Sequence, residues 1–318
     1  MIGYHLYNEN GFYNTLRKNH IESGCKHFQI FAKNPRQTRI ASIKDDDASK
    51  CKKYVEDNDI FLITHASYLL NMSNPDKWDI KINSGINEIN LAIKLGAKGT
   101  VFHVGKHLKL SITEGENLMY NYFNTLIQYI IDNNLNFKII LETSAACGTE
   151  LLSNIQNLGN FYNRFNTQQL QHFKICIDTC HVFSAGYTIH TKEGCLNFIN
   201  EVAVYIGWPN VMVIHLNDSL SLKGCGCKLD RHANINQGFI RDGMRDLLLF
   251  TIDISIPHIL ETPIEENRIV EIHRNEINII NQWMDENYEE NTTNNTLPNL
   301  NQLNINDENE DDEDEENI

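Results

Sequence analysis

The chain has 318 residues with a net charge of −15, and 41% of its residues are hydrophobic, enough for one large domain or two ordinary ones. No stretch approaches the ~20 continuous apolar residues of a membrane span, and the N-terminal residues lack the basic-then-apolar pattern of a signal peptide. These features exclude the membrane-embedded and exported classes, so we expect a soluble intracellular protein, in the cytoplasm or the nucleus, with no membrane partner.

Eight short apolar runs, rich in β-branched and aromatic residues, recur along the first 263 residues. Their near-continuous hydrophobicity predicts strands that are buried on both faces, as in a parallel sheet. In chain order the runs occupy residues 1–7, 27–32, 60–66, 99–105, 137–143, 173–179, 210–218 and 256–263.

Segments with helical spacing lie between these runs, most clearly at residues 79–98, 114–134 and 265–284. Alternation of strand and helix, repeated eight times, predicts a (β/α)8 TIM barrel. An open doubly wound sheet is the main alternative, but the first run is not followed by the Gly-rich phosphate turn that is typical of that fold.

The acidic residues are concentrated at the C-terminus. The last 34 residues hold thirteen Asp and Glu and no Lys or Arg, so the first 284 residues carry only −2 of the net −15. We predict a barrel domain over 1–284 and an acidic, Asn-rich, disordered tail over 285–318, because such a segment cannot bury enough apolar surface to fold. We interpret the tail as a solvated appendage, and a partner-binding or DNA-mimicking segment is the alternative.

Imidazole and carboxylate side chains end most of the predicted strands or follow them closely. Taken singly, each has an ordinary explanation, such as a hydrogen-bonded core His or, for Asp178, a helix cap. A TIM barrel, however, brings the C-terminal ends of its strands to one mouth, where several bare carboxylates would repel one another. Cations would resolve that conflict, and the candidate ligands are His65, His103, Glu142, Asp178, His181, His215, Asp230, His232 and Glu261.

This mixture of five His and four carboxylates suits zinc, manganese or iron. The set exceeds the three or four protein ligands of one catalytic zinc and suits about three metals with one shared ligand. Such a pocket would be net positive and would attract a phosphate. Multi-metal sites of this kind are typical of phosphodiester hydrolysis.

The eight cysteines are scattered, and their close pairs are CxxxC at 176/180 and CxC at 225/227. We expect free thiols, because one CxC is a weak metal signal and no secretory signal is present. Cys176 should pack inside the barrel, since it lies two residues before Asp178 on the same strand. A catalytic thiol is disfavoured because the neighbouring His have other partners.

Longer motifs surround these candidates, and they carry a family resemblance. They are FAKNPRQ (31–37), HASYLLNMSNP (65–75), FHVGKHL (102–108), CIDTCHVFSAGY (176–187), DRHANINQG (230–238) and LETP (260–263). With them, the sequence resembles the endonuclease IV family of apurinic/apyrimidinic (AP) endonucleases from about residue 2 to about residue 284.

The resemblance implies a TIM barrel with three zinc ions per chain and Glu142 and Glu261 as catalytic residues. His5 matches a family His that does not bind metal directly. Position by position, the implied zinc ligand sets are His65, His103 and Glu142; Asp178, His215 and Glu261, with Glu142 as a bridge; and His181, Asp230 and His232.

The resemblance also implies the reaction, which is hydrolysis of the phosphodiester 5′ to an abasic site, leaving a 3′-hydroxyl and a 5′-deoxyribose phosphate. Removal of blocking groups from damaged 3′ ends would accompany it. The partner would be double-stranded DNA containing abasic sites, bound by a monomer during base excision repair. Arg36, Tyr68 and Leu69 would unstack the duplex, and a missing base lowers the cost of flipping the nucleotide out. Arg231 is a candidate phosphate contact, and Lys33 and Lys106 are weaker ones.

Departures from the family pattern fall in loops. Asn236 and Arg241 stand where glycines are common, and FHVGK replaces a more typical Pro-Gly-Ser turn. An alternative enzyme is a sugar isomerase or epimerase on the same barrel, with one or two divalent metals and no need of His181, Asp230 and His232. A damage-binding protein with a decayed site is a third hypothesis. Metal content separates the two enzymes, and an incision assay tests the third hypothesis.

Overall fold

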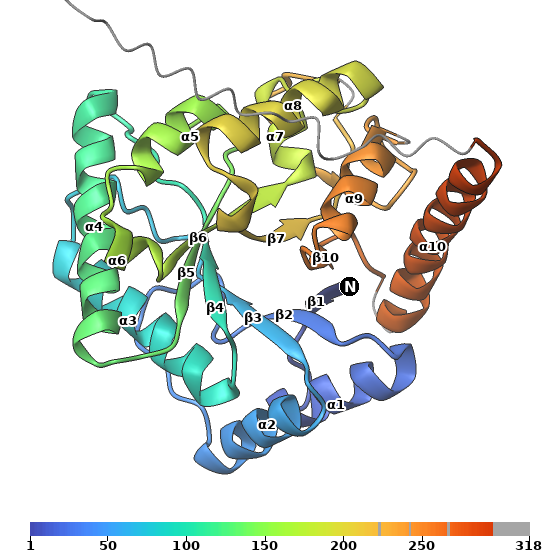
Figure 1. Ribbon diagram of the computed structural model, residues 1–318. Helices are drawn as coiled ribbons and strands as arrows, with labels where there is room; N and C mark the ends of the chain where they lie inside the picture. Colours follow the sequence, from blue (N-terminus) through green and yellow to red (C-terminus); the bar gives the residue numbers. More distant parts are fainter. Residues whose placement is uncertain (222–223, 242, 266–267, 295–318) are drawn as a thin grey trace, which may run out of the picture. The chain divides into compact units, whose positions relative to one another are not determined.

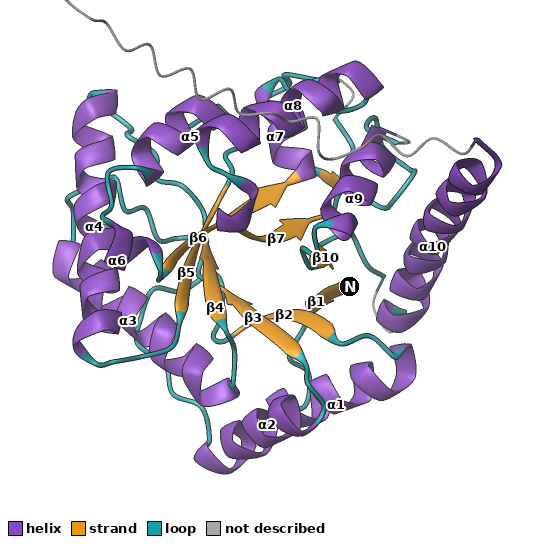
Figure 2. Cartoon of the chain, viewed as in Figure 1, coloured by secondary structure: helices purple, strands orange, loops and turns teal. Residues whose placement is uncertain are grey.

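A closed parallel barrel forms the centre of the computed structural model, which describes residues 1–221, 224–241, 243–265 and 268–294 (Figures 1 and 2). Within these residues, the strands of the barrel follow the order β1-β10-β7-β6-β5-β4-β3-β2. Their bounds are Ile2–Leu6 (β1), His27–Phe31 (β2), Phe61–His65 (β3), Gly99–Phe102 (β4), Lys138–Glu142 (β5), Phe173–Asp178 (β6), Val211–His215 (β7) and His258–Leu260 (β10). Each lies inside one of the eight predicted runs, so the predicted TIM barrel is confirmed.

Helices cover the outside of this barrel (Figure 2). Local sequence sets their ends: Ser111 and Glu114 form a capping box at the start of α4, and Gly96 follows α3 in the left-handed conformation, with φ 83°. The helices are α1 (Phe12–Ser23), α2 (Asp45–Asp57), α3 (Trp78–Leu95), α4 (Ile112–Asp132), α5 (Ile155–Tyr162), α6 (Thr167–Leu170), α7 (Thr179–Ala185), α8 (Lys192–Tyr205), the 3-10 turn η1 (Trp208–Asn210), α9 (Gly243–Asp253) and α10 (Ile269–Asn294).

A layer of fully buried side chains fills the barrel interior, with one residue from each of six strands. Side chains two residues apart point to the same side of a strand, so the next inward position on each strand lies one layer nearer the C-terminal mouth. Cys176 belongs to this fully buried layer, the lower of the two, as predicted. All eight cysteines lie within the described residues and are free thiols. The lower layer is Ile63, Val101, Ile140, Cys176, Val213 and Ile259, and the residues two positions later are His65, His103, Glu142, Asp178, His215 and Glu261.

Gly3 in β1 allows the first two strands to approach closely. A Cβ atom at this position would lie 1.6 Å from the carbonyl oxygen of His27. We expect Gly3→Ala to lower the free energy of unfolding by about 3 kcal/mol or more, since backbone must move to relieve the clash. Thermal unfolding checks this. Gly148→Ala is the control, because its Cβ meets nothing within 4 Å and its φ of +62° costs only about 1 kcal/mol. Equal Tm values for the two variants would contradict the expectation.

Helix α10 corrects the predicted start of the tail. It continues to Asn294, so the boundary predicted after residue 284 lies inside a helix. Glu is a good helix former, and the Gln282 amide donates a 2.9 Å hydrogen bond to Glu286 one turn later. The rest of the predicted disordered tail, 295–318, lies outside the described residues. Residues up to Ile280 form one compact unit. None of the described helices has the length and apolar character that crossing a bilayer requires.

Candidate metal centre

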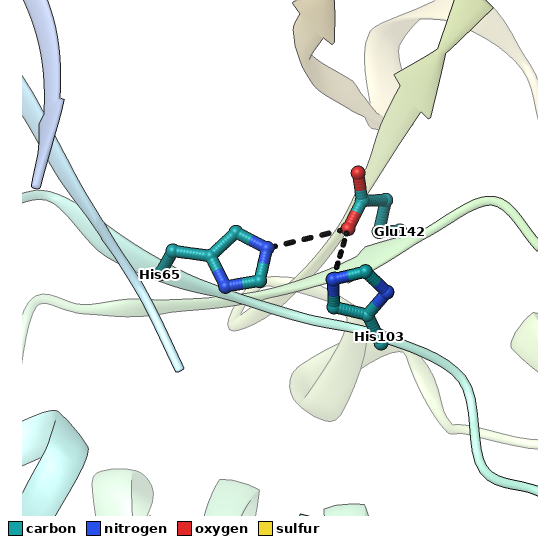
Figure 3. A group of neighbouring side chains, drawn as sticks. All are labelled: His65, His103 and Glu142. Carbon is teal, nitrogen blue, oxygen red and sulfur yellow. Dashed lines mark hydrogen bonds and ion pairs between the residues drawn. The ribbon is translucent and has the colours of Figure 1, made fainter. Parts of the chain in front are cut away.

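The strand ends and the segments that follow them bring the nine predicted ligand residues together at the C-terminal mouth of the barrel. The first group is His65, His103 and Glu142, from three adjacent strands (Figure 3). Nε2 of His65 and Nε2 of His103 lie 3.4 and 3.5 Å from the same Glu142 oxygen, Oε2. Glu142 is fully buried at the end of β5, so both rings face a carboxylate that water does not reach.

The second group shares Glu142 with the first. Nδ1 of His215 lies 2.8 Å from Glu142 Oε1, 3.0 Å from Glu261 Oε2 and 3.8 Å from Asp178 Oδ2. Three carboxylates therefore surround one imidazole nitrogen, and Glu142 presents one oxygen to each of the two groups. This geometry is that of a bridging carboxylate.

The third group lies nearer the solvent. Nε2 of His181 and Nε2 of His232 lie 3.4 and 3.2 Å from Asp230 Oδ1. Asp230 is 45% exposed, whereas the His181 side chain is 3% exposed. His181 comes from α7, and the other two residues come from the long segment after β7, so this group is built outside the strands of the barrel.

Asp178 both caps a helix and faces the site. Its Oδ1 accepts the backbone N–H of His181 at 2.9 Å, which caps α7. Its Oδ2 accepts from the Asn217 amide at 2.7 Å and lies 3.6 Å from Nε2 of His232. Asp178 can therefore cap the helix with Oδ1 and serve as a metal ligand with Oδ2.

Asp218 holds the loop that carries Asp230 and His232. Its two oxygens accept backbone N–H groups of residues 219, 238, 240 and 241 at 2.8–3.3 Å. The loop contains the short antiparallel strands β8 (Asp218–Ser219) and β9 (His232–Ala233). Asn236 and Arg241, which stand where the family commonly has glycine, have φ of 67° and 50°. The backbone thus keeps the left-handed conformation that favours glycine there.

Backbone carbonyl groups determine which ring nitrogen carries the proton in three of the imidazoles. Nδ1 of His65, His181 and His232 lies 2.9, 2.8 and 3.1 Å from a backbone carbonyl oxygen. A carbonyl oxygen only accepts, so each Nδ1 donates, and Nε2 of the neutral ring keeps its lone pair. Within the described part of the chain, the buried Nε2 atoms of His181 and His232 have no hydrogen-bond partner.

The separation of these atoms suits a cation between them. Each of the three Nε2 lone pairs faces a carboxylate oxygen at 3.2–3.4 Å, and two facing lone pairs repel. In a tetrahedral zinc site with ~2.0–2.1 Å bonds, neighbouring ligand atoms are about 3.3 Å apart. The donor set and its spacing therefore fit zinc.

The negative charge in the cluster also needs positive charge to balance it. Burial disfavours the charged form of His232, yet Asp178 and Asp230 raise its pKa to about 9. Burial likewise opposes ionisation of Glu142, but the surrounding imidazoles, led by His103, hold the pKa of its carboxyl well below the usual range. Glu142 is thus ionised, and protons or divalent cations must balance its charge.

Gln29, which the strand-end pattern does not select, lies fully buried beneath the cluster. Its carbonyl oxygen lies 2.9 Å from Nε2 of His215, which must therefore donate, so Nδ1 keeps its lone pair toward Glu142 and Glu261. Its amide nitrogen donates to Glu261 and to Nδ1 of His5, the latter at 3.0 Å. A lone Gln in the apolar run at residues 27–32 is the sequence signal that could have identified it.

The candidate DNA contacts border this site. A cavity of about 200 Å³ opens over the cluster and is lined by ligand side chains together with Tyr7, Phe31 and Tyr68. Tyr68 and Leu69 are each 56% exposed, and Arg36 and Arg231 are also exposed. Of these four, Tyr68 lines the cavity itself, and the other three are exposed to solvent.

The two lysines proposed as weaker phosphate contacts have other partners. The Lys33 side chain is 3% exposed and lies 3.3 Å from Glu88. Lys106 is half-exposed and lies 3.4 Å from Glu150. The prediction therefore does not fit Lys33, whose ammonium group is buried away from the mouth.

Known proteins share this fold and are similar to this sequence. A family model described as xylose isomerase-like TIM barrel matches residues 20–283. A probable endonuclease 4 from Cenarchaeum symbiosum is 31% identical over 256 residues, which cover 79% of this chain and 89% of the relative. A probable endonuclease 4 from Halothermothrix orenii is 31% identical over 266 residues, 82% and 93% of the two chains. The crystal structure of endonuclease IV from Thermus thermophilus has a TM-score of 0.74 at 24% identity, covering 90% of this chain and 99% of that one, and shows the same fold.

Proposed function

Because the chain belongs to the endonuclease IV family of the xylose isomerase-like TIM barrels, we propose that it is a zinc-dependent AP endonuclease of DNA base excision repair. In this proposal it acts as a monomer on double-stranded DNA. It hydrolyses the phosphodiester 5′ to an abasic site and leaves a 3′-hydroxyl and a 5′-deoxyribose phosphate.

One observation carries the proposal, namely the three overlapping groups of imidazoles and carboxylates around Glu142. Their lone pairs converge at the spacing of ligands on a shared cation, and Glu142 faces two groups at once. The nine residues that would hold three zinc ions are His65, His103, Glu142, Asp178, His181, His215, Asp230, His232 and Glu261.

Zinc bound there would supply Lewis acidity toward a phosphate and a water of lowered pKa. The chain's own residues orient the reactants. Glu142 and Glu261 are the proposed catalytic carboxylates, and both face the same nitrogen of His215. Gln29 fixes which His215 nitrogen carries the proton and holds Glu261 from below.

The mouth of the barrel accounts for the preference for an abasic site. Glu261 lines a small cavity and Glu142 is buried behind the histidines that also line it, so a stacked nucleotide inside a duplex cannot reach them. Arg36, Tyr68 and Leu69 are the proposed wedge, and Arg231 is the proposed phosphate contact. A nucleotide without a base unstacks at the least cost.

Cleaning of damaged 3′ ends is the second proposed activity of the same site. A blocked 3′ terminus presents a phosphate ester at the end of a strand, where no stacking opposes entry. The same cations and the same two glutamates would act on it.

The sugar isomerase or epimerase alternative is not favoured. That chemistry needs one or two metals and gives no reason for His181 and His232 to converge on Asp230. The exposed Tyr68 and Leu69 also have no role in binding a small sugar.

Two measurements on the purified protein test the proposed function. Metal analysis should find about three zinc ions per chain. Incision of a duplex with one abasic site should produce a 3′ end that a DNA polymerase can extend, while the matched intact duplex remains uncut. Zinc-loaded protein that leaves the abasic duplex intact would support the damage-binding hypothesis instead.

The acidic tail gives a separate prediction. Its removal should leave the incision rate at saturating substrate unchanged and should tighten DNA binding at low salt, because a polyanion repels phosphate. The variant ends at residue 294 so that α10 remains complete, and Kd is measured at two salt concentrations. Binding that is unchanged or weaker at low salt would discard the DNA-mimicking interpretation.

A further inference from the structure

We propose that Glu88, in α3 and outside the metal cluster, is a positioning residue that locks the loops carrying Arg36, Tyr68 and Leu69 into one DNA-engaging unit. This inference rests on the proposed function, since it takes these three residues as the wedge. It assigns a role to a buried ion pair that the chemistry at the metals does not use.

Glu88 bonds to both loops directly. It is fully buried, and its Oε1 lies 3.3 Å from the ammonium of Lys33, which begins the loop after β2. The same oxygen accepts the backbone N–H of Ser67, in the loop after β3, at 3.1 Å. Lys33 also donates to the Ser84 hydroxyl, one turn before Glu88, at 2.9 Å.

The two loops are also bonded to each other. The carbonyl oxygen of Pro35 accepts the Ser67 hydroxyl at 2.7 Å and the backbone N–H of Tyr68 at 3.1 Å. Arg36 immediately follows Pro35, and Leu69 immediately follows Tyr68. The proposed wedge residues therefore project from two segments that share one set of bonds.

Helix α3 holds the far end of the first loop as well. The Asn87 side chain accepts from the N–H of Ala41 at 2.9 Å and donates to its carbonyl oxygen at 3.0 Å. Arg36 thus lies between two anchors on one helix, Lys33 before it and Ala41 after it. Because α3 holds the loop on both sides of Arg36, it sets the direction in which Arg36 projects.

Stability alone does not explain a buried ion pair here. Replacing such a pair with neutral side chains of similar size is often neutral or stabilising, whereas removing one partner leaves an uncompensated charge. Glu88 Oε2 has no hydrogen-bond partner among the described residues, so the pair is not fully satisfied. The geometry points to register between the loops as the reason for its presence.

The test replaces the whole pair and asks whether DNA engagement is lost while the fold is kept. The double variant Lys33→Met/Glu88→Gln removes both charges at nearly constant volume. It frees the loop after β2 from α3 at position 33, while the new amide oxygen can still accept the N–H of Ser67. We expect a Tm close to that of the unchanged protein and unchanged zinc content. KM for an abasic duplex should rise about 10-fold or more while kcat changes little, because misplaced wedge residues weaken engagement and the metals are not touched.

A second readout follows the wedge itself. A 2-aminopurine base placed beside the abasic site brightens when the duplex is unstacked, and the double variant should brighten it less at saturating protein. The control is Lys50→Met/Asp46→Asn, which removes an exposed ion pair on α2 and should match the unchanged protein in every readout. A double variant with unchanged KM and unchanged brightening would overturn the proposal.

Two further variants keep the test decisive. Glu88→Gln alone leaves Lys33 buried without its partner, and it should lower Tm by about 10 °C. If the double variant does not fold, Ser67→Ala removes one of the two hydrogen bonds between the loops, the one from its hydroxyl to Pro35, without touching a charge, and it should still raise KM. Its failure to do so would also overturn the proposal. If the unchanged protein binds abasic and intact duplexes equally, the proposed function fails, and that outcome is separate from any effect of Glu88.

Discussion

Chelation of its metal ions is expected to abolish incision of abasic DNA by this protein, lowering the rate by about 10³-fold or more. The carboxylates at the barrel mouth cannot by themselves neutralise a phosphate, since they carry the same sign of charge as the substrate. The measurement is incision under single-turnover conditions, together with metal analysis of the same sample.

Chelation should also lower Tm, because cations that bind only the folded cluster stabilise it by mass action. Added Zn²⁺ should restore both activity and Tm. Mg²⁺ should not, because it prefers oxygen ligands and five of the nine groups are imidazoles. Metal-free protein that cuts the abasic duplex at full rate would rule out the proposed centre.

Glu261→Gln is expected to reduce kcat by about 10²- to 10⁴-fold while the fold is retained. Gln has nearly the same shape and still accepts from Gln29, but it removes one of the three negative charges around His215. The Nδ1 lone pair of His215 then faces a neutral amide, which is a weaker metal ligand than a carboxylate, in the second group of candidate ligands. Steady-state incision and zinc content measure the effect, and one zinc ion should bind less tightly.

The matched control for this variant is Glu265→Gln, four residues later in the chain. Glu265 is 70% exposed and pairs with Arg268 away from the cluster, so incision and zinc content should remain unchanged. Near-normal turnover by Glu261→Gln would remove Glu261 from the mechanism.

Much of the candidate site could be predicted from the sequence because strand ends and barrel mouths coincide. Ile63 and His65, like Ile140 and Glu142, are two residues apart on one strand, so the apolar and polar members must point the same way. Once a closed parallel barrel is predicted, the polar member of each pair must lie at the C-terminal mouth.

Other features could not be predicted because their partners lie far away in sequence. The burial of Lys33 depends on Glu88, whose position within an amphipathic helix marks no special role. Gln29 acquires its function from His215, 186 residues later. Composition alone places the end of α10 too early. It detects the change in charge after residue 284 but not the helix propensity that continues to Asn294.

Closure of the barrel has a consequence for the order of events during biosynthesis. β1 is made long before β10, with which it pairs, and β10 directly precedes Glu261. A nascent chain that stops short of this strand leaves the ring open and lacks one carboxylate of the second group. The complete set of candidate ligands therefore forms only after β10 has been made, and partial products that end before it lack the full candidate centre.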